Sequence, residues 1–127
     1  MEKLIGITNA ILASEKGFRT DNSSIKGRFF DGKFYSGTLT QGVICTTQTE
    51  LTKWLREKHN IMVIPMLNNM IPGYHPEKDG FDTNWVCSLR YELADGTPCW
   101  TYDLDITFDT FEDALESGLF DGLNLLK

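Results

Sequence analysis

The segment Asn84–Thr107 constrains the fold most, because it has the pattern of two strands joined by a tight turn. Apolar and polar residues alternate on both sides of Asp95-Gly96, which is the period of a strand with one buried face. Asp-Gly is typical of a two-residue hairpin turn. We therefore expect one register, with Arg90 diagonal to Asp103 on the outer face. The predicted inward pairs are Tyr91 with Trp100, Leu89 with Tyr102, Cys87 with Leu104 and Trp85 with Ile106.

The segment Thr47–Asn60 is predicted to be a helix that precedes this hairpin. Thr47 and Glu50 have the spacing of a capping box, and Asn60 suits a left-handed residue at the helix end. The β-branched run Ile61–Leu67 follows and is typical of a strand. Pro65 cannot donate a backbone hydrogen bond, so the strand is expected at a sheet edge or to end there.

The closing segment Thr110–Leu126 has the apolar period of a helix that buries one side. Thr110 or Asp109 is the expected N-cap, and acids in the first turn complement the helix dipole. Gly118 and Gly122 lie in the apolar stripe, where each costs about 1 kcal/mol relative to alanine. Because close packing would offset this cost, we expect the strip to lie against the aromatic face of the hairpin. The hairpin residues expected there are Trp85, Trp100 and Tyr102.

Residues 1–46 are predicted to form an N-terminal extension of a helix and a hairpin. The expected helix is Thr8–Lys16, with Thr8 as N-cap and Gly17 as its left-handed end. Asp31-Gly32 stands between aromatic pairs and predicts a second hairpin turn.

These elements predict a single α+β domain over residues 1–127. Residues 47–127 form its core in the order helix, strand, strand, strand, helix, with a long loop at 67–83. We expect an antiparallel sheet of three or more strands with both helices on one face. This order looks like the double-stranded-RNA-binding domain.

The charge of the chain is concentrated at its C-terminal end. Residues 103–127 hold seven acids and one base, a balance equal to the net charge of −6 of the whole sequence. The double-stranded-RNA-binding family uses lysines at the start of its last helix, where this chain has acids. Double-stranded nucleic acid is therefore disfavoured as a partner.

The leading hypothesis is a non-enzymatic module that binds another protein. Two surfaces are candidates: the acidic first half of the closing helix, and an apolar group at and before the long loop. The candidate partner-binding residues are Asp109, Glu112, Asp113, Glu116, Met66, Met70 and Tyr74. A homodimer is compatible with this hypothesis.

A second hypothesis is nucleic-acid binding through the N-terminal region, where cations alternate with aromatic residues. The cations are Arg19, Lys26, Arg28 and Lys33, and the aromatic residues are Phe29, Phe30, Phe34 and Tyr35.

A third hypothesis is a metal-dependent enzyme at Asp103 and Asp105, which alternate onto one strand face. The same alternation is ordinary for a solvated strand face. The sequence has no P-loop, dinucleotide, GxSxG, HExxH or CxxC motif, so we expect no enzyme activity and no cofactor.

The cysteines and the N-terminus favour a cytoplasmic protein. Cys45, Cys87 and Cys99 are odd in number and widely spaced, which indicates reduced thiols. No secretory signal and no apolar run long enough to cross a membrane is expected.

Three segments together resemble a group of small uncharacterised proteins found in phages and mobile elements of gut bacteria. The segments are Ala10–Phe18 (AILASEKGF), Thr47–Ile61 (TQTELTKWLREKHNI) and Thr110–Leu126 (TFEDALESGLFDGLNLL). The resemblance implies a bacterial cytoplasmic context. It implies no activity and no site residues, because the group has none assigned.

Overall fold

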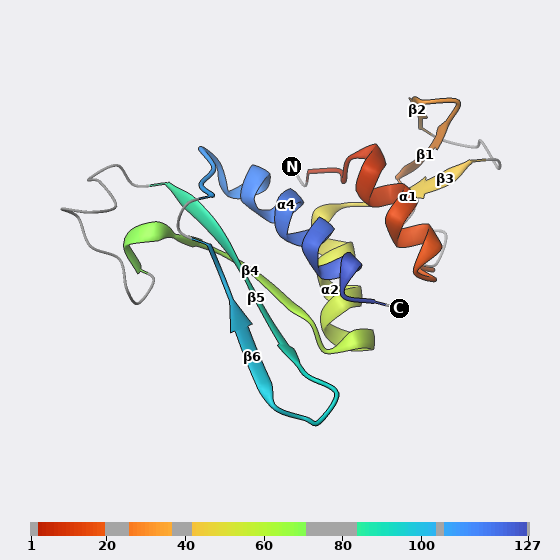
Figure 1. Cartoon of the computed structure of the whole chain (residues 1–127). Helices are drawn as coiled ribbons and strands as arrows, with labels where there is room; N and C mark the ends of the chain where they lie inside the picture. The colour runs from red at the N-terminus through yellow and green to blue at the C-terminus, as the bar shows by residue number, and fades with distance from the viewer. Residues whose placement is uncertain (1–2, 20–25, 37–41, 71–83, 104–105, 127) are drawn as a thin grey trace.

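The computed structural model describes residues 3–19, 26–36, 42–70, 84–103 and 106–126. Within them the chain forms two antiparallel sheets of three strands each, with helices between and beside them (Figure 1). The elements are α1 (Ile7–Glu15), β1 (Gly27–Phe30), β2 (Lys33–Tyr35), β3 (Val43–Cys45), α2 (Gln48–His59), β4 (Met62–Leu67), the 3₁₀ turn η2 (Asn68–Met70), β5 (Trp85–Glu92), β6 (Pro98–Thr101) and α4 (Phe111–Asn124).

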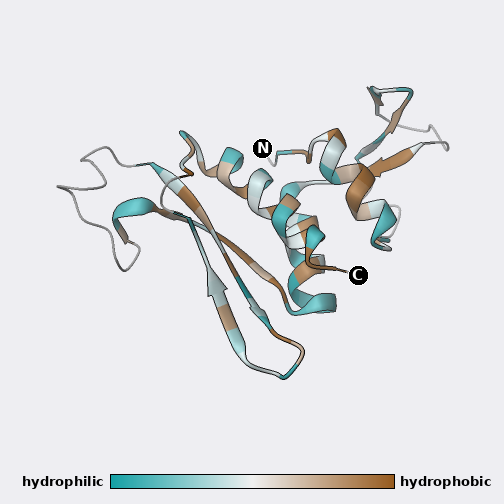
Figure 2. Ribbon diagram, in the orientation of Figure 1, coloured by the Kyte–Doolittle hydropathy of each residue, from teal (hydrophilic) through white to brown (hydrophobic). Residues whose placement is uncertain are grey.

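The larger sheet has the strand order β4-β5-β6, and α2 and α4 pack on its inner face. The expected α+β class, the antiparallel sheet and the helix-strand-strand-strand-helix order from residue 47 are confirmed. The core lies between α4, α2 and β4, where Leu51, Leu55 and Leu119 are fully buried. Figure 2 shows hydrophobic stretches in β4 and α4, whereas the last turns of α2 are hydrophilic.

Both edge strands of this sheet contain a proline. Pro65 lies in β4, at one edge, and Pro98 lies in β6, at the other. Proline has no backbone N–H and is tolerated at sheet edges for that reason. The expected edge position of the strand with Pro65 is confirmed.

Both caps predicted for α2 and the cap predicted for α4 are present. The Thr47 hydroxyl accepts the backbone N–H of Glu50 at 3.1 Å, and Asn60 ends α2 with a φ of 56°. The Thr110 hydroxyl accepts the N–H of Asp113 at 3.1 Å. These bonds satisfy backbone groups that a helix end leaves without partners.

The start of α1 differs from the prediction. The helix begins at Ile7, so the N-cap residue is Gly6 and not Thr8. The Gly6 backbone N–H donates to the carboxylate of Glu116 at 2.8 Å. A side chain from α4 therefore supplies an acceptor at this helix start, which local sequence does not reveal.

The smaller sheet has the order β2-β1-β3 and projects from the molecule beside α1 (Figure 1). The predicted Asp31-Gly32 turn is confirmed: their φ angles are 52° and 78°, and Phe30 pairs with Lys33. Positive φ at both central residues is the geometry of a two-residue type I′ turn. Strand β3 was not predicted.

The register predicted for the β5–β6 hairpin is wrong by one residue. Leu93 N–H donates to the Thr97 carbonyl at 2.9 Å, so the loop has three residues, and Gly96 has a φ of 87°. Asp95 Oδ1 accepts the N–H of Thr97 at 2.9 Å. A three-residue loop with glycine in the left-handed region competes with the two-residue turn. The observed pairs are Leu89 with Thr101, Arg90 with Trp100, Tyr91 with Cys99, and Trp85 with Phe108.

This shift moves Trp100 to the outer face of the sheet, and Leu104 lies outside the described residues. The Arg90 guanidinium stacks over the Trp100 ring at 4.7 Å, and in the observed register Asp103 is no longer the position diagonal to Arg90. Cys87 and Leu89 face the core as expected.

The glycine strip of α4 packs on the sheet, but against different residues from those expected. A Cβ at Gly118 would overlap Cys87 Sγ and lie 2.7 Å from Val63 Cγ1. A Cβ at Gly122 would lie 3.4 Å from Leu55 and Val63 methyl groups. Trp85 instead packs edge-on against Phe111, with the ring centroids 5.3 Å apart.

Among the described residues, no helix has the length and apolar character required to span a membrane.

Candidate partner-binding groove

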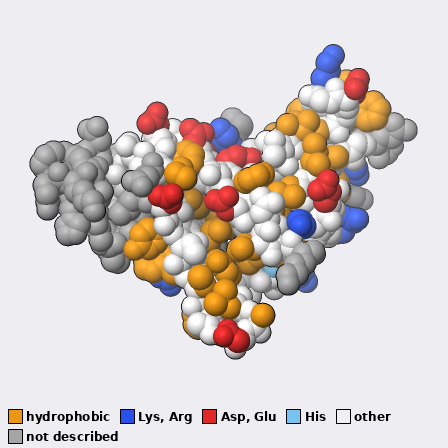
Figure 3. Space-filling model, in the orientation of Figure 1, with side chains coloured by type: hydrophobic (Ala, Val, Ile, Leu, Met, Phe, Trp, Pro, Cys, Tyr) orange, Lys and Arg blue, Asp and Glu red, His pale blue; other side chains and the backbone are white. Residues whose placement is uncertain are grey.

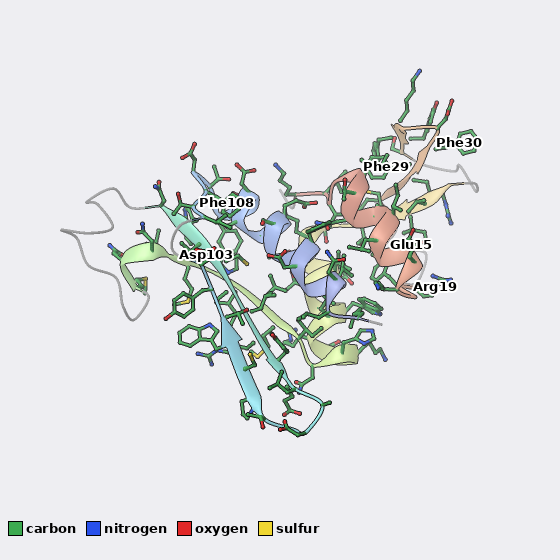
Figure 4. All side chains as sticks on the ribbon, in the orientation of Figure 1. Glu15, Arg19, Phe29, Phe30, Asp103 and Phe108 are labelled. Carbon is green, nitrogen blue, oxygen red and sulfur yellow. The ribbon has the colours of Figure 1, made fainter. Side chains whose placement is uncertain are left out.

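An open groove of about 740 Å³ lies between the first turn of α1 and the solvent side of α4. Its apolar surface comes from both helices and from the segment before α4. Phe108, labelled in Figure 4, pairs with Trp85 of β5 near the start of α4. Its lining includes Ile7, Asn9, Phe108, Asp113, Glu116 and Phe120.

Two large apolar side chains on the helices that form this groove are exposed. Phe120 is 41% exposed and lies off the buried stripe of α4. Ile11 is 42% exposed and follows Ile7 by one helical turn, so both lie on one side of α1. The groove therefore presents apolar surface that the described chain leaves uncovered.

Glu116 forms the polar floor of the groove and joins three elements. Its carboxylate accepts from Gly6 N at 2.8 Å and Asn9 Nδ2 at 2.8 Å on α1, and from Gln48 Nε2 at 3.0 Å on α2. Asn9 Nδ2 also donates to the Glu116 carbonyl at 2.9 Å. Asn9 Oδ1 is buried without a hydrogen-bond partner in the described chain.

The remaining acids of α4 form a negative rim. Asp109, Glu112 and Asp113 are exposed, and Asp113 lines the groove. Figure 3 shows acidic side chains among hydrophobic ones over α4. Of the four acidic candidates, three thus lie on the surface, while Glu116 is engaged by neighbouring elements.

The candidate methionines lie elsewhere. Met66 is half-buried on the outer face of β4, where its sulfur is 3.8 Å from Ser88 Oγ. Met70 is 64% exposed in η2. Tyr74 and most of the predicted 67–83 loop lie outside the described residues. The structure therefore does not join the acidic and methionine candidates into one surface.

The proposed metal pair is only partly described. Asp103 is exposed and lines a cavity of about 270 Å³ with Cys87 and Asp121, whereas Asp105 lies outside the described residues. Burial raises the pKa of Asp121 above its ordinary value. No group of three or more potential metal ligands occurs in the part of the chain that the structure describes.

Two of the thiols should be unreactive in the folded protein. Burial, with a contribution from Asp121, raises the pKa of Cys87 to about 12, and burial, with one from Glu116, raises that of Cys45 to about 11. At pH 8 only about one Cys87 in ten thousand is then a thiolate, the reactive form. We expect Ellman's reagent to label at most Cys99 quickly, and all three thiols in urea. Rapid labelling of a Cys99→Ser variant under native conditions would contradict this.

Sequence reasoning missed the apolar side of the groove. The exposure of Phe120 was predictable, because a large apolar residue that lies off the buried stripe of a helix faces solvent. The position of Ile7 beside α4 was not predictable, since it depends on contacts between distant segments.

Comparisons of this chain with protein-family models, curated proteins and solved structures find no match.

Proposed function

We propose that this protein is a non-enzymatic interaction module that binds a segment of another protein in the groove between α1 and α4. The observation that carries the proposal is the exposed Phe120 beside Asp113 in an apolar groove with an acidic rim. Apolar grooves between helices are a common place for an amphipathic helix to bind.

The partner segment is proposed to be basic as well as apolar. Asp109, Glu112 and Asp113 would repel an acidic segment and attract lysine or arginine beside the apolar anchors. The net charge of −6 would also accelerate the encounter with a basic partner. The resemblance to phage and mobile-element proteins supports a bacterial or phage protein as the partner, in the cytoplasm.

Duplex nucleic acid is not proposed as the ligand of α4. The element order looks like the double-stranded-RNA-binding domain, but the first turn of α4 carries Glu112 and Asp113. Carboxylates at this position repel phosphates.

A synthetic helix tests the groove. The probe is a fluorescent peptide of about five turns with leucines on one face and lysines elsewhere. We expect the intact protein to bind it, and to bind the same peptide with glutamates for lysines at least about tenfold more weakly. Phe120→Ser and Asp113→Lys should each weaken binding by about tenfold, because both remove complementarity at the centre of the groove. Fluorescence anisotropy measures each affinity.

Matched controls lie far from the groove. Phe30→Ser replaces an equally exposed phenylalanine, and Glu92→Lys reverses an exposed acid on β5. Neither should change the affinity. If the wild type binds neither peptide, or if the controls weaken binding as much as the groove variants, the groove is not the docking site.

A further inference from the structure

The outer face of the small sheet combines two aromatic residues with two cations. In the register of β1 and β2, Arg28 pairs with Tyr35 and Phe30 pairs with Lys33. Side chains of cross-strand pairs point to the same face, and alternate residues of a strand share that face. The four residues therefore form a two-by-two pattern, with the aromatic residues on one diagonal and the cations on the other.

The folded chain does not bury these aromatic side chains. Phe30 is 44% exposed and Tyr35 is 42% exposed. Figure 4 shows Phe30 at the outer tip of the sheet. Phe29, on the opposite face, packs against the core and touches Phe34 edge-on at 5.5 Å. Phe29 thus holds its face of the hairpin to the core, although Phe34 beside it is itself 40% exposed. Phe30 and Tyr35 do not belong to the side chains that pack on the core.

The cations are suitably placed beside the rings. Arg28 Nη1 donates to the Gly42 carbonyl at 3.1 Å, which holds the guanidinium along the sheet. The guanidinium has further N–H groups that can donate to a ligand. Lys33 is exposed, and Figure 3 shows a basic side chain at the outermost point of this sheet. Asp31 is the one acid among residues 26–36.

We propose that this face binds single-stranded nucleic acid. Diagonal neighbours on a sheet lie about 7–8 Å apart, so Phe30 and Tyr35 can each stack on a different base of one strand. Arg28 and Lys33 then meet the phosphates between and beside those bases. A duplex hides the faces of its bases, so this pattern favours unpaired strands.

The surface is separate from the acidic groove. The groove lies on α4 and the start of α1, whereas the basic residues lie on strands that project beyond α1 (Figure 1). The repulsion by the acidic end is screened over roughly 10 Å at 0.1 M salt, so it does not prevent phosphate binding at the small sheet.

Fluorescence anisotropy with labelled oligothymidylate and oligouridylate of about 20 nucleotides tests this proposal. We expect the full chain to bind at about 0.1 M salt and the matching duplex to compete at least about tenfold more weakly. Phe30→Ala and Tyr35→Ala should each weaken binding by about 5-fold to 100-fold, the range for losing one stacked base. Lys33→Glu should weaken binding and reduce the salt dependence by about 0.7 in the slope of log affinity against log salt.

Leu93→Ala and Lys58→Glu are the matched controls, because they change an exposed large apolar side chain and an exposed lysine outside this sheet. Both should leave the affinity unchanged, and circular dichroism should show all variants folded. Absence of binding by the wild type overturns the proposal, as does equal weakening by the controls. A third outcome would also overturn the proposal. The wild type would bind no oligonucleotide but would pull down an acidic protein that Phe30→Ala and Tyr35→Ala lose, which would make the face a protein interface.

Discussion

Replacing Glu116 by alanine is expected to lower the free energy of unfolding by about 3 kcal/mol. The substitution removes an acceptor for Gly6 N, Asn9 Nδ2 and Gln48 Nε2 at once. Asn9 and Gln48 are only 2% and 3% exposed, so water replaces the carboxylate less readily for these two donors than for the exposed N–H of Gly6. Losing hydrogen bonds to a charged acceptor costs about 1.5–3 kcal/mol each, less where a donor keeps a second bond. Urea unfolding followed by circular dichroism measures the change.

Two further variants separate the acceptor from the volume of Glu116. Glu116→Gln keeps the shape and one carbonyl oxygen, which can still accept from Gly6 N and Asn9 Nδ2, and turns its N–H₂ toward Gln48 Nε2. We therefore expect it to cost at most about half as much as alanine. Glu112→Ala removes an exposed acid one turn earlier and should cost less than about 1 kcal/mol, the worth of its helix-dipole interaction. A Glu116→Ala protein as stable as Glu112→Ala would mean that the hydrogen bonds do not hold α1 to α4.

Replacing Gly118 by leucine is expected to destabilise the protein by about 3 kcal/mol. The first added atom would already overlap Cys87 Sγ and lie 2.7 Å from Val63 Cγ1. Both neighbours belong to the inner face of the sheet on which α4 packs, so a larger side chain must displace them or move α4 away from the sheet. Overpacking of this kind typically costs 1–3 kcal/mol, and leucine adds three more carbons beyond the first. The midpoint of urea unfolding reports the loss.

Gly122→Ala is the matched control on the same strip. Its added methyl group would lie at ordinary contact distance, 3.4 Å from Leu55 and Val63. Alanine favours the helix over glycine by about 1 kcal/mol, so this variant should be neutral or more stable. Equal destabilisation by both variants would show that helix geometry and not contact with Cys87 sets the cost. An unchanged Gly118→Leu protein would mean that α4 does not pack on the sheet as described.

Local rules predicted much of the secondary structure. The caps at Thr47, Asn60 and Thr110 and the Asp31-Gly32 turn depend on residues within a few positions of one another. The same dipeptide misled the prediction at Asp95-Gly96. There the loop takes three residues, and the one-residue change places Trp100 outside. Because turns of two and three residues both accept Asp-Gly, the dipeptide alone does not choose the register.

The candidate groove was only half predictable. The four acids at the start of the last helix were predicted to form a binding surface, and three of them are exposed. Glu116 instead binds Gly6, which is 110 residues away in the chain, so no spacing in the sequence reveals this contact. The aromatic and basic residues near the N-terminus were visible as a set. Their division into an inward Phe29 and an outward Phe30 required the register of β1 and β2.

The prolines at both margins of the larger sheet limit how copies of this protein can assemble. A dimer that joins two sheets into one needs a continuous row of backbone donors on the meeting strands. Pro65 interrupts that row on β4 and Pro98 interrupts it on β6. Continuous six-stranded pairing, and the fibrous aggregation that grows from it, is therefore disfavoured. If the protein forms a homodimer, we expect the two copies to meet through side-chain surfaces and not through hydrogen bonds between their edge strands.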